Sequence, residues 1–186
     1  MKRLFDLALA VIIGLFALAP AIVVVIAIKL TSKGPILYWS ARVGAYNRIF
    51  DMPKFRSMRT DTPTVATHLL TDANLYMTPI GSFLRRSSLD ELPQLLSIIK
   101  GDMSFVGPRP ALYNQYDLIN LRTVHGVHTL TPGLTGWAQV NGRDELSIAD
   151  KVKYDEEYLR KRSLPFDFKI LWLTALNVLN QKGISH

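Results

Sequence analysis

"SSLDELPQLLSIIKGDMSFVGPRP" covers residues 87–110 and places two acids, Asp90 and Glu91, side by side. Residues 88–91, S-L-D-E, match the capping box S-x-x-E. We therefore expect Ser88 to cap the start of a helix and Glu91 to be the third residue of that helix. Pro93 falls in the first turns, where proline disturbs a helix least. Acids that complement the positive end of a helix would therefore explain much of this pattern.

Basic residues on both sides of the acids argue for a second role. Arg85 and Arg86 precede them, and Arg109 follows on a Gly-Pro-Arg-Pro turn. Adjacent helical side chains point about 100° apart, so Asp90 and Glu91 cannot both serve the helix end. A carboxylate near arginines and a phosphate can hold Mg²⁺ or attack phosphorus. The chain has neither a G-x-x-x-x-G-K-[ST] loop nor a dinucleotide fingerprint, so common nucleotide-binding folds are not indicated.

The composition is that of a folded, basic protein. The chain has 186 residues, 48% of them hydrophobic, and a formal net charge of +7. This size suits one domain, or one domain with a membrane element, and the apolar content excludes general disorder. The positive charge predicts anionic partners such as nucleic acid, phosphorylated ligands or acidic lipid. The absence of cysteine from the sequence excludes disulfides, thiol catalysis and cysteine-bound zinc.

The segment from Leu7 to Ile28 carries no charge, and as a straight helix it would be about 33 Å long, enough to cross a bilayer. A cleaved signal peptide is one explanation, with a small-x-small site at residues 17–19, but the apolar run continues past that site. A membrane-spanning anchor is the second explanation. It conflicts with the positive-inside rule, because the segment is basic at both ends. The flanking basic residues are Lys2, Arg3, Lys29 and Lys33.

Pro20 favours a third explanation, a helix that enters the membrane and leaves it on the same side. Proline removes a helical hydrogen bond and clashes with the preceding turn, so it kinks or breaks a helix. The apolar part before Pro20 would be about 20 Å long, too short to cross the membrane by itself. A re-entrant membrane helix broken at Pro20 would place both basic flanks on one side, so we favour it over the other two explanations.

A small β-hairpin is predicted next. Residues 36–44 and 48–58 are rich in β-branched and aromatic residues, and the sequence AYNR joins them. Pro53 makes the second strand an edge strand. Lys54 and Arg56 lie two residues apart and therefore on one face, which suits either a basic surface near anionic lipid or a phosphate-binding strand.

The C-terminal third combines a turn-rich stretch with two helices. The stretch LTPGLTGWAQVNGRDELS at residues 130–147 is expected to form turns. In it, Gln139, Asn141 and Arg143 suit either contacts with a nucleotide or sugar or a structural loop. A charged helix that includes Asp155 is predicted next. The last helix is strongly apolar, which suits a membrane interface and a protein core equally.

Together these motifs resemble those of the monotopic phosphoglycosyl transferases, which are small bacterial sugar transferases. The resemblance covers nearly the whole chain. Its specific part is the block TPIGSFLRRSSLDELPQLLSIIKGDMSFVGPRP, at residues 78–110, with GLTGWAQVNGR behind it. Weaker support comes from KRLFDLALA, GPILYWSARVG, PKFRSMRTD and KYDEEYL.

The resemblance implies an enzyme that transfers a sugar 1-phosphate from a UDP-sugar to polyprenyl (undecaprenyl) phosphate and releases UMP. This reaction initiates bacterial glycoconjugate assembly. The implied location is the cytoplasmic face of the bacterial inner membrane. The implied partners are the UDP-sugar, polyprenyl phosphate and membrane lipid, with no nucleic acid.

The resemblance also implies roles for single residues. Asp90 would attack the β-phosphorus to form a covalent phosphosugar–aspartyl intermediate, and it would hold Mg²⁺ in part. Glu91 would orient Asp90 or assist at the metal. Candidate phosphate contacts are Lys54, Arg56, Arg85 and Arg109, and weaker candidates for donor binding are Gln139, Asn141, Arg143 and Asp155.

We therefore expect a mixed α and β, mostly helical fold. A re-entrant membrane helix would cover residues 1–33, and one continuous catalytic domain, with a small hairpin and interfacial amphipathic helices, would cover residues 34–186. Two other functions stay open. A non-catalytic, membrane-anchored basic protein that binds anionic lipid would need neither Asp90 nor Glu91. An aspartyl-phosphate phosphohydrolase would form the same intermediate and pass it to water.

Overall fold

The computed structural model describes residues 1–63, 73–142 and 145–179, most of which are helical. The α-helices are α1 (Lys2–Thr31), α2 (Gly81–Arg86), α3 (Leu95–Lys100), α4 (Tyr116–Val124), α5 (Trp137–Val140), α6 (Ile148–Lys161) and α7 (Leu164–Leu179). Short 3-10 helices cover Ala45–Asn47, Ala73–Tyr76, Leu89–Gln94 and Val127–Thr129. The strands are β1 (Leu37–Val43), β2 (Ile49–Phe55), β3 (Ser104–Val106) and β4 (Gly133–Thr135). The predicted mixed, mostly helical fold with a small hairpin is confirmed.

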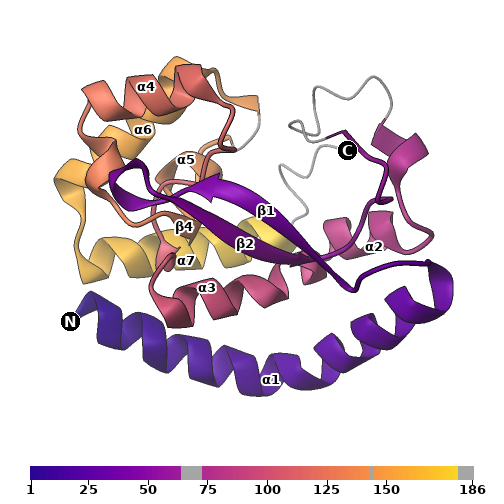
Figure 1. Ribbon diagram of the computed structural model, residues 1–186. Helices are drawn as coiled ribbons and strands as arrows, with labels where there is room; N and C mark the ends of the chain where they lie inside the picture. The colour runs from indigo at the N-terminus through magenta and orange to yellow at the C-terminus, as the bar shows by residue number, and fades with distance from the viewer. Residues whose placement is uncertain (64–72, 143–144, 180–186) are drawn as a thin grey trace.

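Helix α1 runs without interruption through Pro20 for 30 residues, so the predicted break is replaced by a bend. Figure 1 shows the two halves of α1 meeting at an angle near the middle of the helix. Proline costs the helix one backbone hydrogen bond, but the turns before and after it keep theirs, so the helix continues with a changed direction.

Both ends of α1 are bonded to the rest of the protein. At the start, Lys2 Nζ donates to Asp167 Oδ2 of α7 at 2.6 Å, and Arg3 donates to backbone carbonyls near the end of α3. Just after the end of α1, the Ser32 hydroxyl accepts a hydrogen bond of 2.8 Å from Arg56 Nη2. The two ends therefore lie on the same body, with the bent middle between them (Figure 1).

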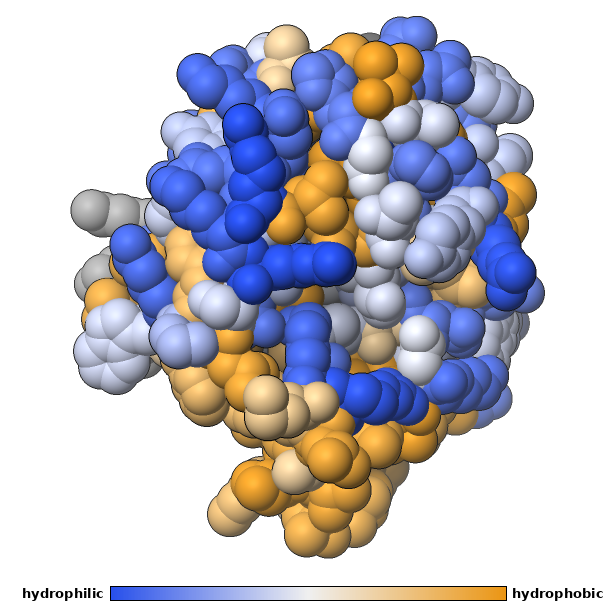
Figure 2. Space-filling model, turned by 90° about the vertical axis from the view of Figure 1, so that its left-hand side faces the viewer, coloured by the Kyte–Doolittle hydropathy of each residue, from blue (hydrophilic) through white to orange (hydrophobic). Residues whose placement is uncertain are grey.

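The middle of α1 exposes apolar side chains. In the described part of the chain, α1 is the one helix long and apolar enough to cross a membrane, judged by length and composition. Figure 2 shows apolar residues gathered at the bottom of the molecule, where α1 lies, and hydrophilic residues over much of the upper part. The large apolar side chains that α1 exposes between its two ends are Val11, Ile12, Leu15, Phe16, Leu18, Ile22, Val23 and Ile26.

The predicted hairpin is formed by β1 and β2, which pair antiparallel with Tyr38 opposite Lys54 and Trp39 opposite Pro53. Tyr46 and Asn47 adopt positive φ angles of 55° and 58° in the turn, a conformation that asparagine tolerates better than most residues. Because β1 and β2 form a two-stranded sheet, Pro53 is on an edge strand, as the sequence predicts.

A second, parallel pair of strands was not predicted. Strands β3 and β4 pair through Ser104 with Gly133 and Val106 with Thr135. Their backbones approach so closely that a Cβ atom on Gly133 would collide with the backbone of Gly107. The stretch at residues 130–147 thus begins with a strand, and its glycines permit close backbone contact as well as turns.

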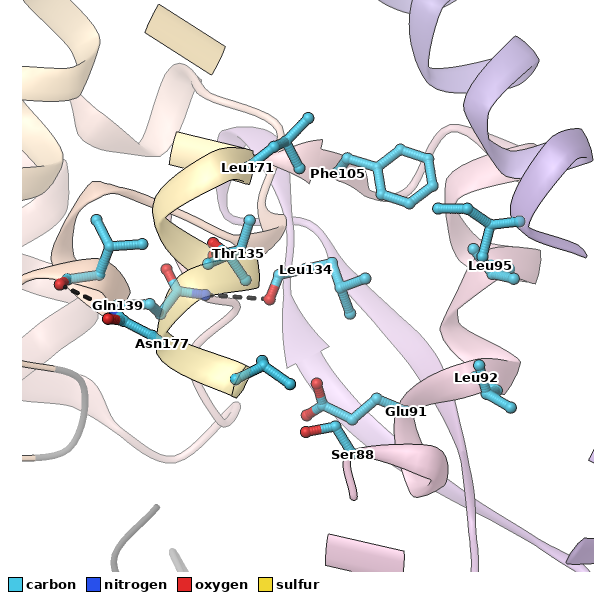
Figure 3. A pocket seen from close by; sticks show the side chains of 14 residues that line it. Ser88, Glu91, Leu92, Leu95, Phe105, Leu134, Thr135, Gln139, Leu171 and Asn177 are labelled. Carbon is cyan, nitrogen blue, oxygen red and sulfur yellow. Dashed lines mark hydrogen bonds between the residues drawn. The ribbon is translucent and has the colours of Figure 1, made fainter. Parts of the chain in front are cut away.

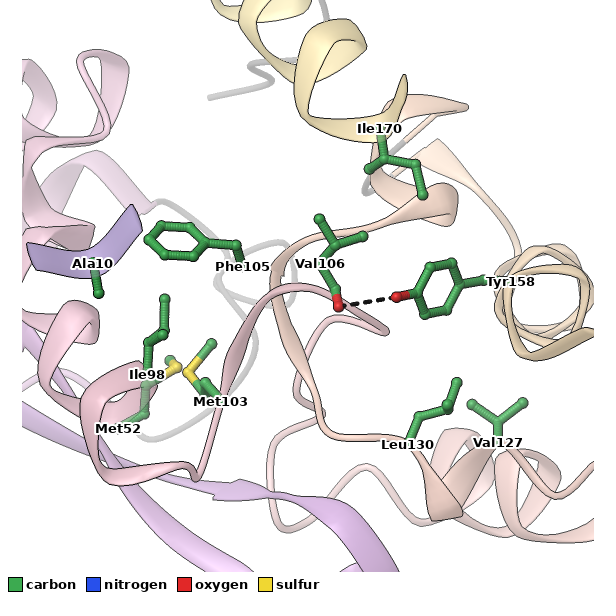
Figure 4. Packing of buried hydrophobic residues seen from close by; sticks show 10 residues of the cluster. All are labelled: Ala10, Met52, Ile98, Met103, Phe105, Val106, Val127, Leu130, Tyr158 and Ile170. Carbon is green, nitrogen blue, oxygen red and sulfur yellow. Dashed lines mark hydrogen bonds between the residues drawn. The ribbon is translucent and has the colours of Figure 1, made fainter. Parts of the chain in front are cut away.

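A common apolar core joins the two halves of the fold. Figure 4 shows Phe105 and Val106 of β3 at its centre, with Ala10 of α1 on one side and Ile170 of α7 on the other. The Tyr158 hydroxyl of α6 donates to the Val106 carbonyl at 3.2 Å, so a hydrogen bond also crosses this core. Strand β3, which leads directly into the Gly-Pro-Arg-Pro turn, is therefore held from both sides.

Candidate active site

The two acids lie on the 3-10 helix Leu89–Gln94, which packs against β2. The predicted capping box is wrong. Ser88 adopts a left-handed conformation with φ 56°, and its side chain makes no capping hydrogen bond to the described residues. The carboxylate of Glu91, which a capping box would turn back toward Ser88, is instead bound by two cations.

Glu91 joins two basic residues that are distant in sequence. Its Oε1 atom accepts hydrogen bonds from Lys54 Nζ at 2.9 Å and from Arg109 Nη2 at 3.3 Å. Lys54 comes from β2 and Arg109 from the turn after β3, so Glu91 links the hairpin to that turn. The side chains of Lys54 and Glu91 are only 16% and 15% exposed, which shields this ion pair from solvent.

Asp90 is buried, with 6% of its surface exposed, and lies near enough to this charged group for its charges to act on the carboxyl. Burial raises the pKa of Asp90 to about 6, and the negative charge of Glu91 adds to the increase. The cations Lys54, Arg85 and Arg109 act in the opposite direction, toward a lower pKa. A carboxylate of this kind is still mostly ionised at neutral pH, yet poorly hydrated, which suits a nucleophile.

Arg85 joins the group from α2. Its Nε donates to the Ser57 hydroxyl at 3.2 Å, which holds the guanidinium beside the end of β2. Burial lowers the pKa of Arg85, while Asp90 and Glu91 raise it, so its charge is coupled to both acids. The structure therefore brings together five of the predicted site residues: Lys54, Arg85, Asp90, Glu91 and Arg109.

Arg42 is a site residue that the sequence analysis missed. Burial, together with the nearby charge of Arg109, lowers its pKa to about 10, and Glu91 acts to raise it. Arg42 Nη1 donates to the Pro110 carbonyl at 3.1 Å, so it supports the turn that carries Arg109. The alternation of β1 could have revealed it, because Arg42 and Tyr38 share a face and Tyr38 lies opposite Lys54.

Two of the predicted ligands support the framework in this structure. The Arg56 guanidinium is bonded to Ser32 at the end of α1, and its role as a phosphate ligand stays a prediction. Asp155 is buried on α6, and its Oδ2 accepts hydrogen bonds from Arg122 at 3.0 and 2.7 Å. Arg122 also donates to the Arg109 carbonyl at 2.8 Å, so Asp155 contributes to the position of the Arg109 turn.

The remaining predicted donor contacts fall in or near α5. Gln139 lines a cavity and donates to the Leu134 carbonyl at 3.2 Å, while Asn141 donates to the Trp137 carbonyl at 2.7 Å. Arg143 lies outside the described residues. For all three, contact with the donor stays a prediction.

A cavity of about 280 Å³ adjoins Glu91. Its walls come from α1, the 3-10 helix with the acids, α3, both strands of the parallel pair, α5 and α7 (Figure 3). Most of the lining is apolar, and Glu91 is the one carboxylate among the described residues that line it. Glu91 therefore lies between the cations Lys54 and Arg109 and an apolar space.

The acid pair suits one mode of magnesium binding. Within the described ranges, no group of three or more histidine and acidic side chains could enclose a metal. Mg²⁺, however, is commonly held by one or two carboxylates together with substrate phosphates, and Asp90 is a carboxylate that suits such a donor set. The predicted Mg²⁺ fits this shared mode of binding.

A buried carboxylate near cations is typical of a functional site for an anionic ligand, and the long apolar helix beside it is compatible with association with a membrane. Sequence comparison makes the class specific. The family described as "Bacterial sugar transferase" matches residues 1–181, and the chain belongs to this family. The family recognised from the motifs is thereby confirmed.

Curated relatives agree with this assignment. The chain is 44% identical to "UDP-glucose:undecaprenyl-phosphate glucose-1-phosphate transferase" of Xanthomonas campestris pv. campestris over 97% of its length, and 42% identical to "Undecaprenyl-phosphate glucose phosphotransferase" of Komagataeibacter xylinus over 93%. It spans only 39% and 35% of these two proteins. It is 38% identical to "Uncharacterized sugar transferase EpsL" of Bacillus subtilis, over 99% of the chain and 90% of that protein.

Proposed function

We propose that this protein transfers a sugar 1-phosphate from a UDP-sugar to polyprenyl phosphate and releases UMP. The observation that carries the proposal is Asp90, a buried carboxylate with a raised pKa, on which the nearby cations Lys54, Arg85 and Arg109 act. The names of two relatives contain both undecaprenyl phosphate and a glucose phosphate transfer, which supports the same substrate classes here.

In the first step, an Asp90 carboxylate oxygen attacks the β-phosphorus of the UDP-sugar. The bond from this phosphorus to the bridging oxygen breaks, and UMP leaves with that oxygen. The product on the protein is an acyl phosphate, a mixed anhydride between the Asp90 carboxyl group and the sugar phosphate. Arg85, Arg109 and Lys54 would offset the negative charge that the diphosphate brings to the two acids.

In the second step, a phosphate oxygen of polyprenyl phosphate attacks the same phosphorus. The bond between phosphorus and the Asp90 oxygen breaks, which gives the polyprenyl diphosphate sugar and restores the carboxylate. Two displacements at one aspartate let a soluble donor and a lipid acceptor use one site in turn. Glu91 would keep Lys54 and Arg109 directed at the reacting phosphates throughout, since it binds both.

Mg²⁺ is proposed as a cofactor, held by Asp90 together with the donor diphosphate. When bound, it would supply positive charge that stabilises the leaving UMP.

The protein is proposed to lie on the cytoplasmic face of the bacterial inner membrane, with α1 as a re-entrant helix. Both ends of α1 are bonded to the same body, while its bent middle exposes apolar side chains. Such a helix can dip into one leaflet and return, with its basic flanks on the cytoplasmic side. The acids would then face the membrane surface, where a lipid phosphate can reach them.

The proposal is tested with the purified protein and a panel of UDP-sugars, beginning with UDP-glucose. Without lipid we expect at most one UMP per protein molecule, and an intact protein mass increased by one sugar phosphate. Adding undecaprenyl phosphate should restore turnover. Asp90→Asn should abolish both signals, whereas Asp102→Asn, at an exposed acid, should keep them.

Each alternative function gives a different outcome. Free sugar phosphate as the main product would indicate a phosphohydrolase. Unchanged turnover in Asp90→Asn would disprove the covalent mechanism. A protein that binds anionic vesicles but releases no UMP with any UDP-sugar would be a non-catalytic lipid-binding protein.

A further inference from the structure

We propose that the apolar cavity beside Glu91 binds the first isoprene units of the lipid acceptor, those next to its phosphate. This inference rests on the proposed function, because it assigns a place to one of its substrates. Asp90 and the nearby cations account for the phosphates, and the adjoining cavity has no role assigned so far except the predicted donor contact of Gln139 in its wall.

The walls of the cavity match a hydrocarbon better than a sugar or a nucleobase. Leu92, Leu95, Phe105, Leu134 and Leu171 contribute to the lining shown in Figure 3, whose surface is mostly apolar. The lining also contains four uncharged polar side chains on its α5 and α7 side, and each has a hydrogen-bond partner within the protein: Thr135 and Thr174 bond to each other, and the amide nitrogens of Gln139 and Asn177 donate to backbone carbonyls. A sugar carries hydroxyl groups that need hydrogen-bond partners, and burying them against such walls would be unfavourable. A branched hydrocarbon gains from the same walls by losing its contact with water.

The polar end of the cavity fits the phosphate of the same ligand. In Figure 3, Ser88 and Glu91 lie at one end of the cavity, and Phe105 and Leu171 lie at the other. Glu91 binds Lys54 and Arg109, so two cations stand at the end where an anionic head group would sit. The cavity thus offers positive charge and then apolar surface, in the order that a polyprenyl phosphate presents its two parts.

The membrane helix forms part of the same cavity. Ile13 of α1 lines it, and the neighbouring side chains of Ile12 and Phe16 are exposed on the outside of the helix. In the proposed re-entrant placement, these outer side chains contact lipid while Ile13 faces the cavity. A chain that begins in the cavity would therefore continue into the membrane along α1.

The size of the cavity sets how much of the lipid it can hold. Apolar cavities of about 150 Å³ accept a benzene ring, so a volume near 280 Å³ has room for about ten carbon atoms. Ten carbons correspond to about two isoprene units. The rest of the polyprenyl chain would remain in the bilayer.

The test fills the cavity and compares the two half-reactions. Leu95→Trp places a larger side chain in the lining, and Leu96→Trp, at the neighbouring and half-exposed position of the same helix, is the matched control. We expect Leu95→Trp to release one UMP per protein as the unmodified protein does, but to raise the KM for undecaprenyl phosphate at least about tenfold. The ten-carbon acceptor geranyl phosphate should show the same increase, and Leu96→Trp should show neither.

Three results would overturn the inference while the proposed function survived. One is an unchanged acceptor KM in Leu95→Trp. The second is a higher KM for the UDP-sugar instead, which would assign the cavity to the donor. The third is an effect on undecaprenyl phosphate but not on geranyl phosphate, which would place the tail contacts outside the cavity.

A binding measurement keeps the inference testable if Leu95→Trp does not fold or if no UDP-sugar is turned over. Geranyl phosphate with a diazirine on its second isoprene unit is cross-linked to the unmodified protein, and the labelled peptides are identified. We expect labels on α3 and α7, at peptides that contain Leu95 and Leu171, and excess undecaprenyl phosphate should remove them. Labels elsewhere, or labels that survive competition, would disprove the assignment.

Discussion

Lys54 Nζ lies 2.9 Å from Glu91 Oε1, although 37 positions of the chain separate the two residues. The contact fixes the hairpin against the 3-10 helix that carries Asp90. Because the same Glu91 oxygen also binds Arg109, Glu91 acts here as the link that holds two cations beside Asp90. A link of this kind sets the charge around Asp90 by holding Lys54 and Arg109 in place.

The Lys54–Glu91 pair should be measurable by a double-mutant cycle. Lys54→Met and Glu91→Gln are each expected to lower the free energy of unfolding by about 1–3 kcal/mol, since each removes a hydrogen bond to a charged, mostly buried group. The double variant should lose less than the sum, which denaturant unfolding would measure. Arg59→Met, in an ion pair whose members are 59% and 58% exposed, should cost less than about 1 kcal/mol. Strict additivity of Lys54→Met and Glu91→Gln would contradict the link.

Activity should follow the ionisation of Asp90. Only the carboxylate can attack phosphorus, and burial raises its pKa to about 6. We therefore expect kcat/KM for the UDP-sugar to rise through pH 6 and to level off above about pH 7, since this parameter reports the free protein. A flat profile from pH 5 to pH 8 would show that ionisation of Asp90 does not limit the reaction in this range.

The raised pKa of Asp90 also predicts a gain in stability on its removal. A native pKa of about 6, against an ordinary value of 3.8, means that the folded state favours the protonated acid. This contribution to stability is fully present below about pH 4 and is lost as the pH rises through about 6. Asp90→Asn should therefore be more stable than the unmodified protein at pH 7.5, by on the order of 2–3 kcal/mol, and nearly equal to it at pH 4. Thermal unfolding at both pH values would measure the difference, and a loss at pH 7.5 would contradict it.

The sequence predicted the parts of the site that lie within one motif or alternate along one strand. Asp90, Glu91, Arg85 and Arg109 belong to one continuous block, and Lys54 follows from the period of the hairpin. The features that the sequence did not predict depend on contacts between segments that are distant in the chain. The residue types at positions 88–91 match a capping box, but Ser88 makes no capping hydrogen bond to the described residues. Glu91 instead binds Lys54 and Arg109, which are distant in sequence, and these contacts replace the local one.

The parallel pair of β3 and β4 shows a related limit of sequence analysis. Each strand has only three residues, which is too few to show an alternating pattern. The glycines near them predict turns and not strands. Their true role is close backbone approach between Gly107 and Gly133, which depends on both segments at once. For α1, the sequence predicted part of the result. Pro20 indicated where the helix changes direction, but the sequence did not show whether the helix would bend or break there.

The buried pair of Arg122 and Asp155 should control the Arg109 turn. Arg122→Met leaves the Asp155 carboxylate buried without this cation and removes a donor from the Arg109 carbonyl, so we expect a loss of about 3–5 kcal/mol in stability and a fall in kcat. Arg122→Lys should recover the charge but not the two-pronged contact, and so only part of the activity. Arg160→Met is the control. Arg160 is 68% exposed and pairs with Glu156 at 3.5 Å, so its replacement should change the free energy of unfolding by no more than about 0.5 kcal/mol. Equal effects of Arg122→Met and Arg160→Met would contradict the role assigned to Arg122.

The course of α1 can be tested by labelling, because the chain has no cysteine of its own. A cysteine placed before Met1 and Lys33→Cys mark the two ends of the helix, Lys100→Cys marks the body, and Phe16→Cys marks the exposed apolar middle. With a membrane-impermeant maleimide, we expect both ends and the body to be labelled in inverted membrane vesicles and protected in intact cells. Phe16→Cys should be protected in both until detergent is added. If the two ends were labelled from opposite sides, α1 would span the bilayer, and the contacts of Lys2 with Asp167 and of Arg56 with Ser32 could not both exist in the membrane.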